Sequence, residues 1–229
     1  MIHYLALPVW AAGITYRRSL DGRGEEARDA TPYDRVYKAP RPQLFFKCAP
    51  GHAVGDRGTI GLRDDSNWIV PEPELVVIAD PAARIVGYTL GNDVSCRDIE
   101  GENVLYQSQA KIFTRSCALG PRLVTPADLP ESHDLAITMT VTRNAGGGVM
   151  GEWPEVVFSG ACDTGQMKRS PRELVDWLFR YNDFPNGVAL MTGTGIVPPP
   201  DFTLLDGDVV SIRCEPIGVL SNTARVLKK

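Results

Sequence analysis

Three acidic residues, Glu72, Glu74 and Asp93, are the side chains of this chain best suited by type and spacing to do chemistry. Glu74 begins the apolar run ELVVIA, and strand side chains alternate between two faces, so Glu72 and Glu74 are predicted to share one face. A turn at Asp80-Pro81 and a returning strand would bring Asp93 beside them. Because buried carboxylates repel one another, such a group requires a cation, and an all-oxygen set favours Mg²⁺, Mn²⁺ or Ca²⁺ over zinc. The alternative is two surface glutamates near a turn aspartate.

The elements that must position these residues are mostly strands. The sequence has 22 glycines and 18 prolines spread between short apolar runs, a pattern typical of a β-rich fold with many turns. Strands are expected at residues 10–16, 43–48, 58–63, 74–80, 84–92, 121–125, 135–144, 153–160, 187–193 and 208–222.

Helices are expected to be few. The clearest begins after Ser170 as N-cap, with Pro171 at the first helical position and apolar residues up to Tyr181 at helical spacing. Residues 98–110 could form a short helix or a turn. The charged stretch at residues 19–30 could cover an active site or be a solvated loop.

Composition excludes several classes of function. The net charge is −4 with both signs interspersed, which argues against binding to nucleic acid or to an anionic membrane surface. No apolar window reaches membrane-spanning length, and no basic segment precedes the apolar start, so we expect a cytoplasmic protein. Five scattered cysteines without a CxxC pair predict reduced thiols, and Cys96 is expected to be inert. Three isolated histidines, at positions 3, 52 and 133, give no triad.

The segment from Gly87 to Thr125, with Arg97-Asp98 and Gln109-Ala110-Lys111, resembles the fumarylacetoacetate hydrolase family. The motifs RDIEGEN, LYQSQAK and SCALGP are most similar to its 2-keto-3-deoxy-sugar-acid dehydratase branch. The resemblance implies a mainly β fold (β-rich α+β), a mixed β-sandwich roll with few short helices. It also implies one catalytic domain over residues 1–229, without the small N-terminal domain usual in that branch, and a homodimer or higher homo-oligomer.

The resemblance further implies that Glu72, Glu74 and Asp93 hold a divalent cation, usually Mg²⁺, with open positions for a small 2-oxo acid. Such a site stabilises an enolate. The function implied is a lyase that dehydrates a 2-keto-3-deoxy sugar acid. The alternatives are a hydrolase or decarboxylase of acylpyruvate or oxaloacetate type, and a catalytically impaired member that binds a sugar acid.

By the same resemblance Lys111 is a base or proton carrier, and Thr194 contributes to binding the substrate carboxylate. Glycines such as Gly193 let backbone N–H groups approach an anion closely. The alternatives are a surface lysine and a plain glycine turn. Arg97 could grip the substrate with two contacts or be a structural ion-pair partner. Lys47 and Arg18 are lesser candidates for the polar end of the substrate and could instead be solvated.

One position departs from the pattern of the dehydratase branch. Gln43 stands where that branch carries a glutamate implicated in acid-base work, and an amide cannot take or give a proton in that way. Gln43 would then orient a water or a substrate hydroxyl, or the dehydratase activity would be weak.

Overall fold

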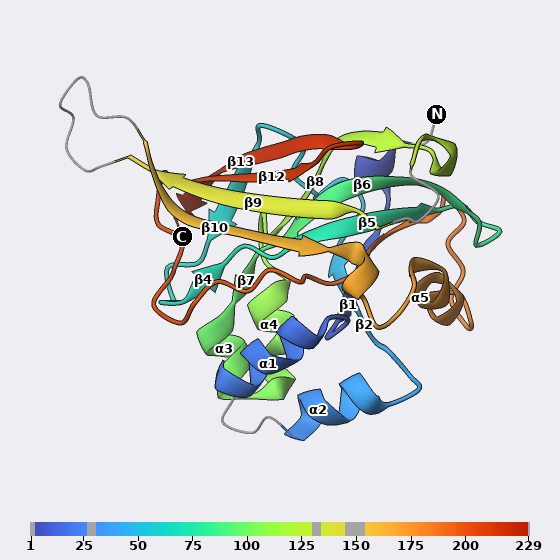
Figure 1. Ribbon diagram of the computed structural model, residues 1–229, viewed down its shortest axis with the longest axis horizontal. Helices are drawn as coiled ribbons and strands as arrows, with labels where there is room; N and C mark the ends of the chain where they lie inside the picture. Colours follow the sequence, from blue (N-terminus) through green and yellow to red (C-terminus); the bar gives the residue numbers. More distant parts are fainter. Residues whose placement is uncertain (1–2, 27–30, 130–133, 145–153, 229) are drawn as a thin grey trace.

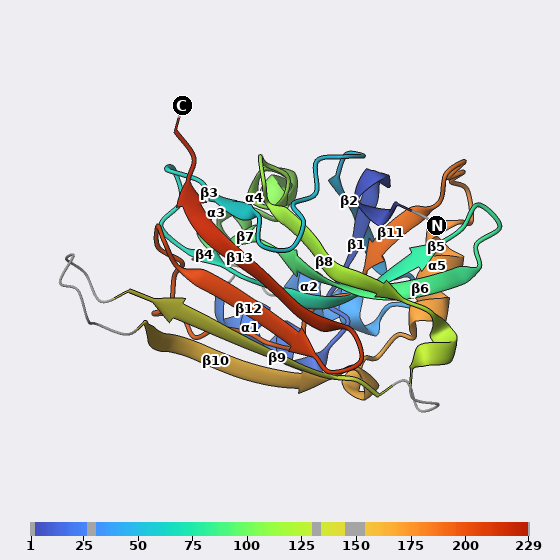
Figure 2. The same ribbon diagram turned by 90° about the horizontal axis from the view of Figure 1, so that it is seen from above.

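A computed structural model of the chain describes residues 3–26, 31–129, 134–144 and 154–228 (Figure 1). The strands form two main sheets, one of six strands in the order β2-β1-β11-β5-β6-β8 and one of five in the order β10-β9-β12-β13-β3. Strands β4 and β7 form a separate pair. Figure 2 shows β9, β10, β12 and β13 side by side as one layer. The predicted β-rich fold with few short helices is confirmed.

The strands are β1 (Val9–Gly13), β2 (Gln43–Cys48), β3 (Thr59–Leu62), β4 (Ile69–Val70), β5 (Pro73–Ala79), β6 (Ile85–Asp93), β7 (Ser95–Cys96), β8 (Cys117–Val124), β9 (Ala136–Arg143), β10 (Glu155–Asp163), β11 (Val188–Met191), β12 (Val209–Cys214) and β13 (Gly218–Val226). The helices are α1 (Arg17–Glu26), α2 (Thr31–Lys38), α3 (Arg97–Glu102), α4 (Gln107–Lys111) and α5 (Pro171–Leu178). Short 3₁₀ turns are η1 (Tyr4–Ala6), η2 (Val104–Tyr106), η3 (Pro126–Asp128) and η4 (Thr164–Gln166).

The six-stranded sheet carries apolar side chains on both faces, because successive side chains along each strand point into two different cores. On β5, Val76 and Ile78 belong to one buried cluster, whereas Leu75 and Val77 belong to the other. The cluster that contains Leu75 and Val77 also includes the inward side chains of the five-stranded sheet, such as Met139. This sheet is therefore covered on one face by the other sheet, and its remaining face encloses a core of its own.

The two edges of the six-stranded sheet, β2 and β8, meet. Val54, in the loop after β2, donates its N–H to Cys117 O at 2.8 Å and accepts from Leu119 N at 2.8 Å, which makes a parallel bridge to β8. The interior cluster includes Cys117 and Leu119 and packs against Phe45 and Cys48 of β2. The sheet is thus rolled up around the cluster that contains Val76 and Ile78, and we call the β2–β8 junction the seam.

The local predictions succeeded where short-range signals were strong. Strands β5 and β6 form the predicted antiparallel hairpin, with Val76 opposite Thr89. Helix α5 starts as predicted, with Ser170 Oγ accepting from Glu173 N at 3.1 Å. Tyr181, expected on its buried face, is 99% exposed, because the helix ends at Leu178.

Other predictions were incomplete. Residues 208–222 form two strands, β12 and β13, joined by a tight turn in which Pro216 lacks the N–H that a continuous strand needs. Helix α2 was not predicted. The stretch at residues 19–30 is helical as far as Glu26, and residues 27–30 lie outside the described residues.

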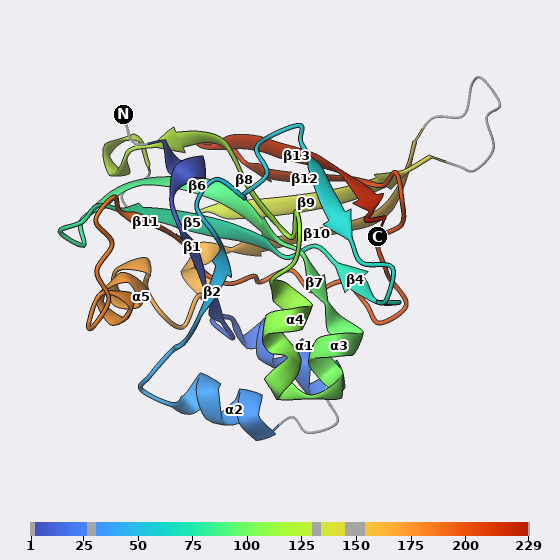
Figure 3. The ribbon, with the colours of Figure 1, turned by 180° about the vertical axis from the view of Figure 1, so that it is seen from behind.

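Helices α1, α2, α3 and α4 gather at one end of the rolled sheet (Figure 3). Helices α3 and α4 follow directly from the end of β6 and β7, and α1 follows from the end of β1. In the described part of the chain, no helix is long and apolar enough to cross a membrane. The short helices therefore cover the end of the roll at which β5 begins and β6 ends.

Candidate active site

The carboxylates of Glu72, Glu74 and Asp93 meet at this end of the roll. Because β5 and β6 are antiparallel, the start of one lies beside the end of the other, and Asp93 N donates to Glu72 O at 2.9 Å. Glu74 shares the inner face of the sheet with Val76 by strand alternation. One oxygen of each carboxylate lies within 4.8 Å of the others, and the three residues are at most 3% exposed. The interpretation as separate surface carboxylates is wrong.

Two lysines, one from β2 and one from α4, pair with carboxylates of this cluster. Lys111 at the end of α4 places Nζ 2.6 Å from Glu72 Oε2 and 3.0 Å from Asp93 Oδ2, and it donates to Ser95 Oγ at 2.6 Å. Lys47 on β2 places Nζ 2.5 Å from Asp93 Oδ1. Both ammonium groups are almost fully buried. Asp93 is thus held on both carboxylate oxygens.

Lys47 does not reach the open part of the site. Its Nζ also donates to Val94 O at 3.2 Å and to the backbone oxygen of Lys111. It therefore ties β2 to the end of β6 and to α4, behind the carboxylates. In this structure Lys47 holds Asp93 and Lys111 in position, whereas the sequence interpretation placed it at the polar end of a substrate or in solvent.

The turn after β11 supplies a backbone donor to the cluster. Gly193 N donates to Glu74 Oε2 at 2.5 Å. Gly193 has φ +94°, and a Cβ there would overlap Thr15 Oγ1, which itself donates to Thr192 O at 2.6 Å. A glycine is thus required by both conformation and space. In this structure the Gly193 N–H contacts the Glu74 carboxylate. The next residue, Thr194, lines the cavity.

Helix α3 adds a second pair of charged residues. Arg97 Nη2 lies 3.2 Å from Glu72 Oε1, and Glu100 follows three residues later on the same helix face. Both are buried, at 2% and 4% exposure. Glu100 is therefore not a surface carboxylate, whereas Glu102 on the same helix is exposed. Arg97 is an ion-pair partner of Glu72, one of the two roles left open for it.

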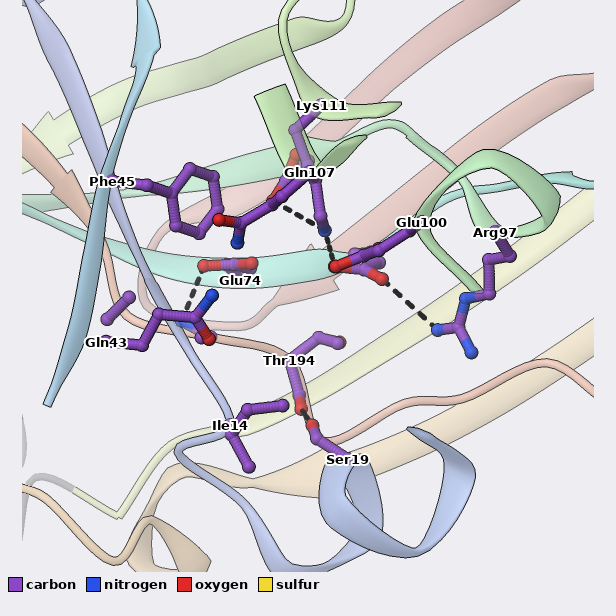
Figure 4. A pocket seen from close by; sticks show the side chains of 15 residues that line it. Ile14, Ser19, Gln43, Phe45, Glu74, Arg97, Glu100, Gln107, Lys111 and Thr194 are labelled. Carbon is purple, nitrogen blue, oxygen red and sulfur yellow. Dashed lines mark hydrogen bonds and ion pairs between the residues drawn. The ribbon is translucent and has the colours of Figure 1, made fainter. Parts of the chain in front are cut away.

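These groups line one cavity (Figure 4). Gln43 and Phe45 approach Glu74 from β2, Gln107 and Lys111 come from α4, and Thr194 lies opposite them. A Cβ at Gly13, opposite Gln43 in the β1–β2 register, would overlap the Gln43 side chain, so Gly13 leaves the room in which that amide lies. The site is walled on one side by an amide and a phenyl ring and on the other by charged groups.

Other predicted residues lie elsewhere. Arg18 is exposed and lines a separate hollow beside Phe158 and Gly195. His3 and His52 are not among the residues of the cavity, and His133 lies outside the described residues. Burial raises the pKa of the Cys96 thiol to about 11, which keeps it protonated and agrees with its inert interpretation.

Glu100, Gln107, Phe45 and Ser95 line or support the site but were not picked out as site residues from the sequence. One signal could have revealed Glu100, namely its i,i+3 spacing from Arg97 on a short helix. Phe45 and Gln107 carry no such signal, because polar and apolar residues of their types are common in any strand or helix.

The charges and burial of the cluster indicate a shortage of positive charge. Burial, with the nearby Asp93 and Glu72 carboxylates, raises the pKa of Glu74 well above its ordinary value. Burial acts on Asp93 in the same direction, but the Lys111 and Lys47 ammonium groups outweigh it and lower the pKa of that carboxyl. Two of the three carboxylates are thus paired with lysines, and Glu74 lacks a full counter-charge. An all-oxygen donor set in this state fits a hard divalent cation.

Replacing Gly193 with alanine tests the role of the turn. We expect Gly193→Ala to weaken divalent-cation binding about tenfold or more, because the Cβ displaces the N–H that orients Glu74. Titration calorimetry would measure this. Gly51→Ala is a matched control, since Gly51 also has positive φ (+77°) but no atom within 4 Å of its Cβ position. Equal effects of the two substitutions would contradict the positioning role.

Lys47→Met should destabilise the protein strongly. Removal of one partner of a buried ion pair costs about 3–5 kcal/mol in unfolding free energy, because Asp93 keeps its charge without full compensation. Lys38→Met, at an exposed pair with Asp34, should change it by less than about 1 kcal/mol. Urea denaturation of both variants gives the comparison. A Lys47→Met loss no larger than that of Lys38→Met would show that Asp93 does not depend on this lysine.

Comparisons with known proteins agree with this geometry. The chain is 45% identical over 215 residues to a probable 2-keto-3-deoxyxylonate dehydratase of Haloferax volcanii, covering 94% of this chain and 71% of the relative. It is 39% identical over 225 residues to a 2-dehydro-3-deoxy-D-arabinonate dehydratase of Saccharolobus solfataricus, covering 96% of this chain and 72% of the relative.

A solved structure of 2-keto-3-deoxy-D-arabinonate dehydratase complexed with magnesium and 2,5-dioxopentanoate is also similar, with a TM-score of 0.86 and 38% identity. The match covers 98% of this chain and 74% of that one. Residues 9–225 match the family described as Fumarylacetoacetate (FAA) hydrolase C-terminal. The rolled sheet with its carboxylate cluster, the sequence relatives and the solved structure all lead to one assignment: the chain belongs to the fumarylacetoacetate hydrolase family.

Proposed function

We propose that this protein is a Mg²⁺-dependent hydro-lyase that removes water from a 2-keto-3-deoxy sugar acid. The observation that carries the proposal is the buried group of Glu72, Glu74 and Asp93 at one end of the roll, facing a cavity that also holds acid-base residues. Two relatives at 39% identity or more are named as dehydratases of such acids, and a similar structure binds magnesium with 2,5-dioxopentanoate.

Glu72, Glu74 and Asp93 would hold the cation. When bound, it supplies Lewis-acid polarisation of a 2-oxo group and of the carboxylate next to it. Within the described residues, no other group of three acidic side chains lies close enough together to hold a cation. Magnesium is preferred over Mn²⁺ or Ca²⁺ because the structurally similar dehydratase is complexed with magnesium.

Dehydration needs a base and an acid. A base takes a proton from C3, next to the ketone, a C3–C4 double bond forms, and the C4 hydroxyl leaves as water after it receives a proton. One proton then moves from C5 to C3, and the resulting C4–C5 enol becomes the aldehyde of 2,5-dioxopentanoate. Lys111 is the basic group nearest the carboxylates. Beside a divalent cation its buried ammonium loses its proton more easily, and Nζ can then accept the C3 proton. Ser95 Oγ and the two carboxylates then orient that nitrogen.

The acid must be a residue other than Gln43, because a side-chain amide cannot supply a proton. Glu100 is the one further carboxylate among the described residues that line the cavity. In Figure 4 it lies on the other side of Glu74 from Gln43. We assign proton delivery to Glu100 and orientation of a substrate hydroxyl to the Gln43 amide. Thr194, in the turn opposite α4, is assigned to the substrate carboxylate.

The hydrolytic alternative has less support. Hydrolysis of an acylpyruvate needs a group that activates water, and among the described residues no histidine lines the cavity. Activity toward acylpyruvates or oxaloacetate is therefore expected to be much lower than toward 2-keto-3-deoxy acids.

Turnover and cation binding test the proposal together. With Mg²⁺, 2-keto-3-deoxypentonates should give 2,5-dioxopentanoate, which can be followed by NMR, and chelation should abolish the reaction. In calorimetry, Asp93→Ala should remove Mg²⁺ uptake, because a charged ligand is lost, whereas Glu102→Gln on the exposed end of α3 should keep it. No turnover of any such acid would refute the substrate class, and unchanged uptake by Asp93→Ala would refute the ligand set.

The two candidate acid positions can be separated by substitution. We expect Glu100→Gln to lower kcat about 10²- to 10⁴-fold, the usual contribution of a positioned acid, and Gln43→Ala to act mainly on KM. Gln43→Glu should change kcat little while Glu100 is intact. Steady-state kinetics with a 2-keto-3-deoxypentonate gives both constants. A full rate in Glu100→Gln, combined with a large gain in Gln43→Glu, would transfer the role to position 43.

A further inference from the structure

Two cysteines lie against each other at the seam of the rolled sheet. Cys48 is the last residue of β2 and Cys117 the first residue of β8. Their thiols are hydrogen-bonded to each other, and both side chains belong to the core inside the roll. These strands are 69 positions apart in the chain numbering but are joined here by the Val54 bridge, whose N–H donates to Cys117 O at 2.8 Å.

The other cysteines lack this arrangement. The Cys96 thiol is hydrogen-bonded to Ser66 and that of Cys162 to Tyr16, and burial raises the pKa of each to about 11. Cys48, by contrast, is half-buried and follows Lys47 directly. The hydrogen bond from Cys117 lowers the pKa of the Cys48 thiol, burial opposes this, and the Lys47 ammonium lowers it further. A thiolate next to a lysine, partly accessible, is the reactive form of cysteine.

We propose that Cys48 and Cys117 form a redox-active dithiol, which a hydroperoxide oxidises to a disulfide across the seam. The Cys48 sulfur attacks the O–O bond, which breaks as an S–O bond forms, and the hydroperoxide leaves as an alcohol or water. The Cys117 sulfur then attacks the sulfenic acid of Cys48. An S–S bond forms, the S–O bond breaks, and the departing hydroxide takes the Cys117 proton as water.

The disulfide would act on the carboxylate cluster through short connections. Cys117 lies opposite Asp93 in the β6–β8 register, and Cys48 is next to Lys47, whose Nζ is 2.5 Å from Asp93 Oδ1. Closing the disulfide reorients the Cys48 and Cys117 side chains at the ends of β2 and β8. Because Lys47 adjoins Cys48 and Asp93 lies opposite Cys117, we expect this reorientation to disturb the pairing of Lys47 with Asp93. Oxidation is therefore expected to weaken cation binding, a consequence that rests on the cation site of the proposed function.

Peptide mapping tests the dithiol without any metal. Treatment with one equivalent of hydrogen peroxide, followed by digestion without reductant, should give a peptide that links Cys48 to Cys117 and an intact mass lower by two hydrogen atoms. Cys48→Ser and Cys117→Ser should not form the link, whereas Cys162→Ser, which removes another half-buried thiol, should form it fully. Oxidation of the wild-type chain that leaves Cys48 and Cys117 unlinked overturns the proposal, whatever the fate of the variants.

Calorimetry with Mg²⁺ tests the coupling. The reduced protein should bind the cation, and the oxidised protein should bind it about tenfold more weakly, as for other disturbed outer contacts of a metal site, with recovery after dithiothreitol. Equal affinities in the two redox states would overturn the coupling to Asp93. Failure of the reduced protein to bind Mg²⁺ would instead refute the cation site of the proposed function, while the mapped disulfide would stand independently.

Discussion

The whole active end of the molecule depends on one constraint, the compensation of three carboxylates placed in an apolar interior. Glu72, Glu74 and Asp93 are buried together, and carboxylates in such surroundings are too costly to keep without partners. Each compensating group comes from a different element: Lys47 from β2, Lys111 from α4, Arg97 from α3 and the Gly193 N–H from the turn after β11. The contacts that neutralise the cluster are therefore the same contacts that hold the end of the roll together, and the position of each element is tied to the charge of the site.

This arrangement is poorly explained as a source of stability. Two desolvated charges recover only part of their hydration energy in a pair, and apolar residues of similar size are often at least as stabilising. The stability of the roll is better attributed to its two apolar cores, one between the sheets and one inside the curled sheet. The charged end is instead what a cation and an anionic substrate require. In a site closed off from water, fixed charges act more strongly on a reacting group than they would in solvent, and they need no rearrangement during the reaction.

The features that could be predicted from the sequence are those that depend on residues close together in the chain. The shared face of Glu72 and Glu74, the β5–β6 hairpin and the capped start of α5 depend on residues a few positions apart, and all three are present in the structure. The resemblance to a family supplied the fold and the identity of Lys111. Lys47 and Asp93 are 46 positions apart in the sequence, and they meet only because the roll brings β2 to the end of β6. No local sequence pattern carries that information. Burial of Glu100 likewise depends on where α3 docks, which spacing within the helix indicates but does not fix.

Strand β2 shows why a rolled sheet can combine several roles on one short segment. An edge strand in an open sheet would present its outer backbone to solvent, but here the seam places β2 against β8 and against the end of β6. Gln43 and Phe45 of this strand face the cavity in which substrate would lie, Lys47 holds the carboxylate of Asp93, and Cys48 at the end of the strand touches Cys117. A small shift of this strand must change the charge around Asp93 and the wall of the cavity together. For that reason a covalent bond at the seam, between two residues that do not line the cavity, is a physically direct way to act on the site.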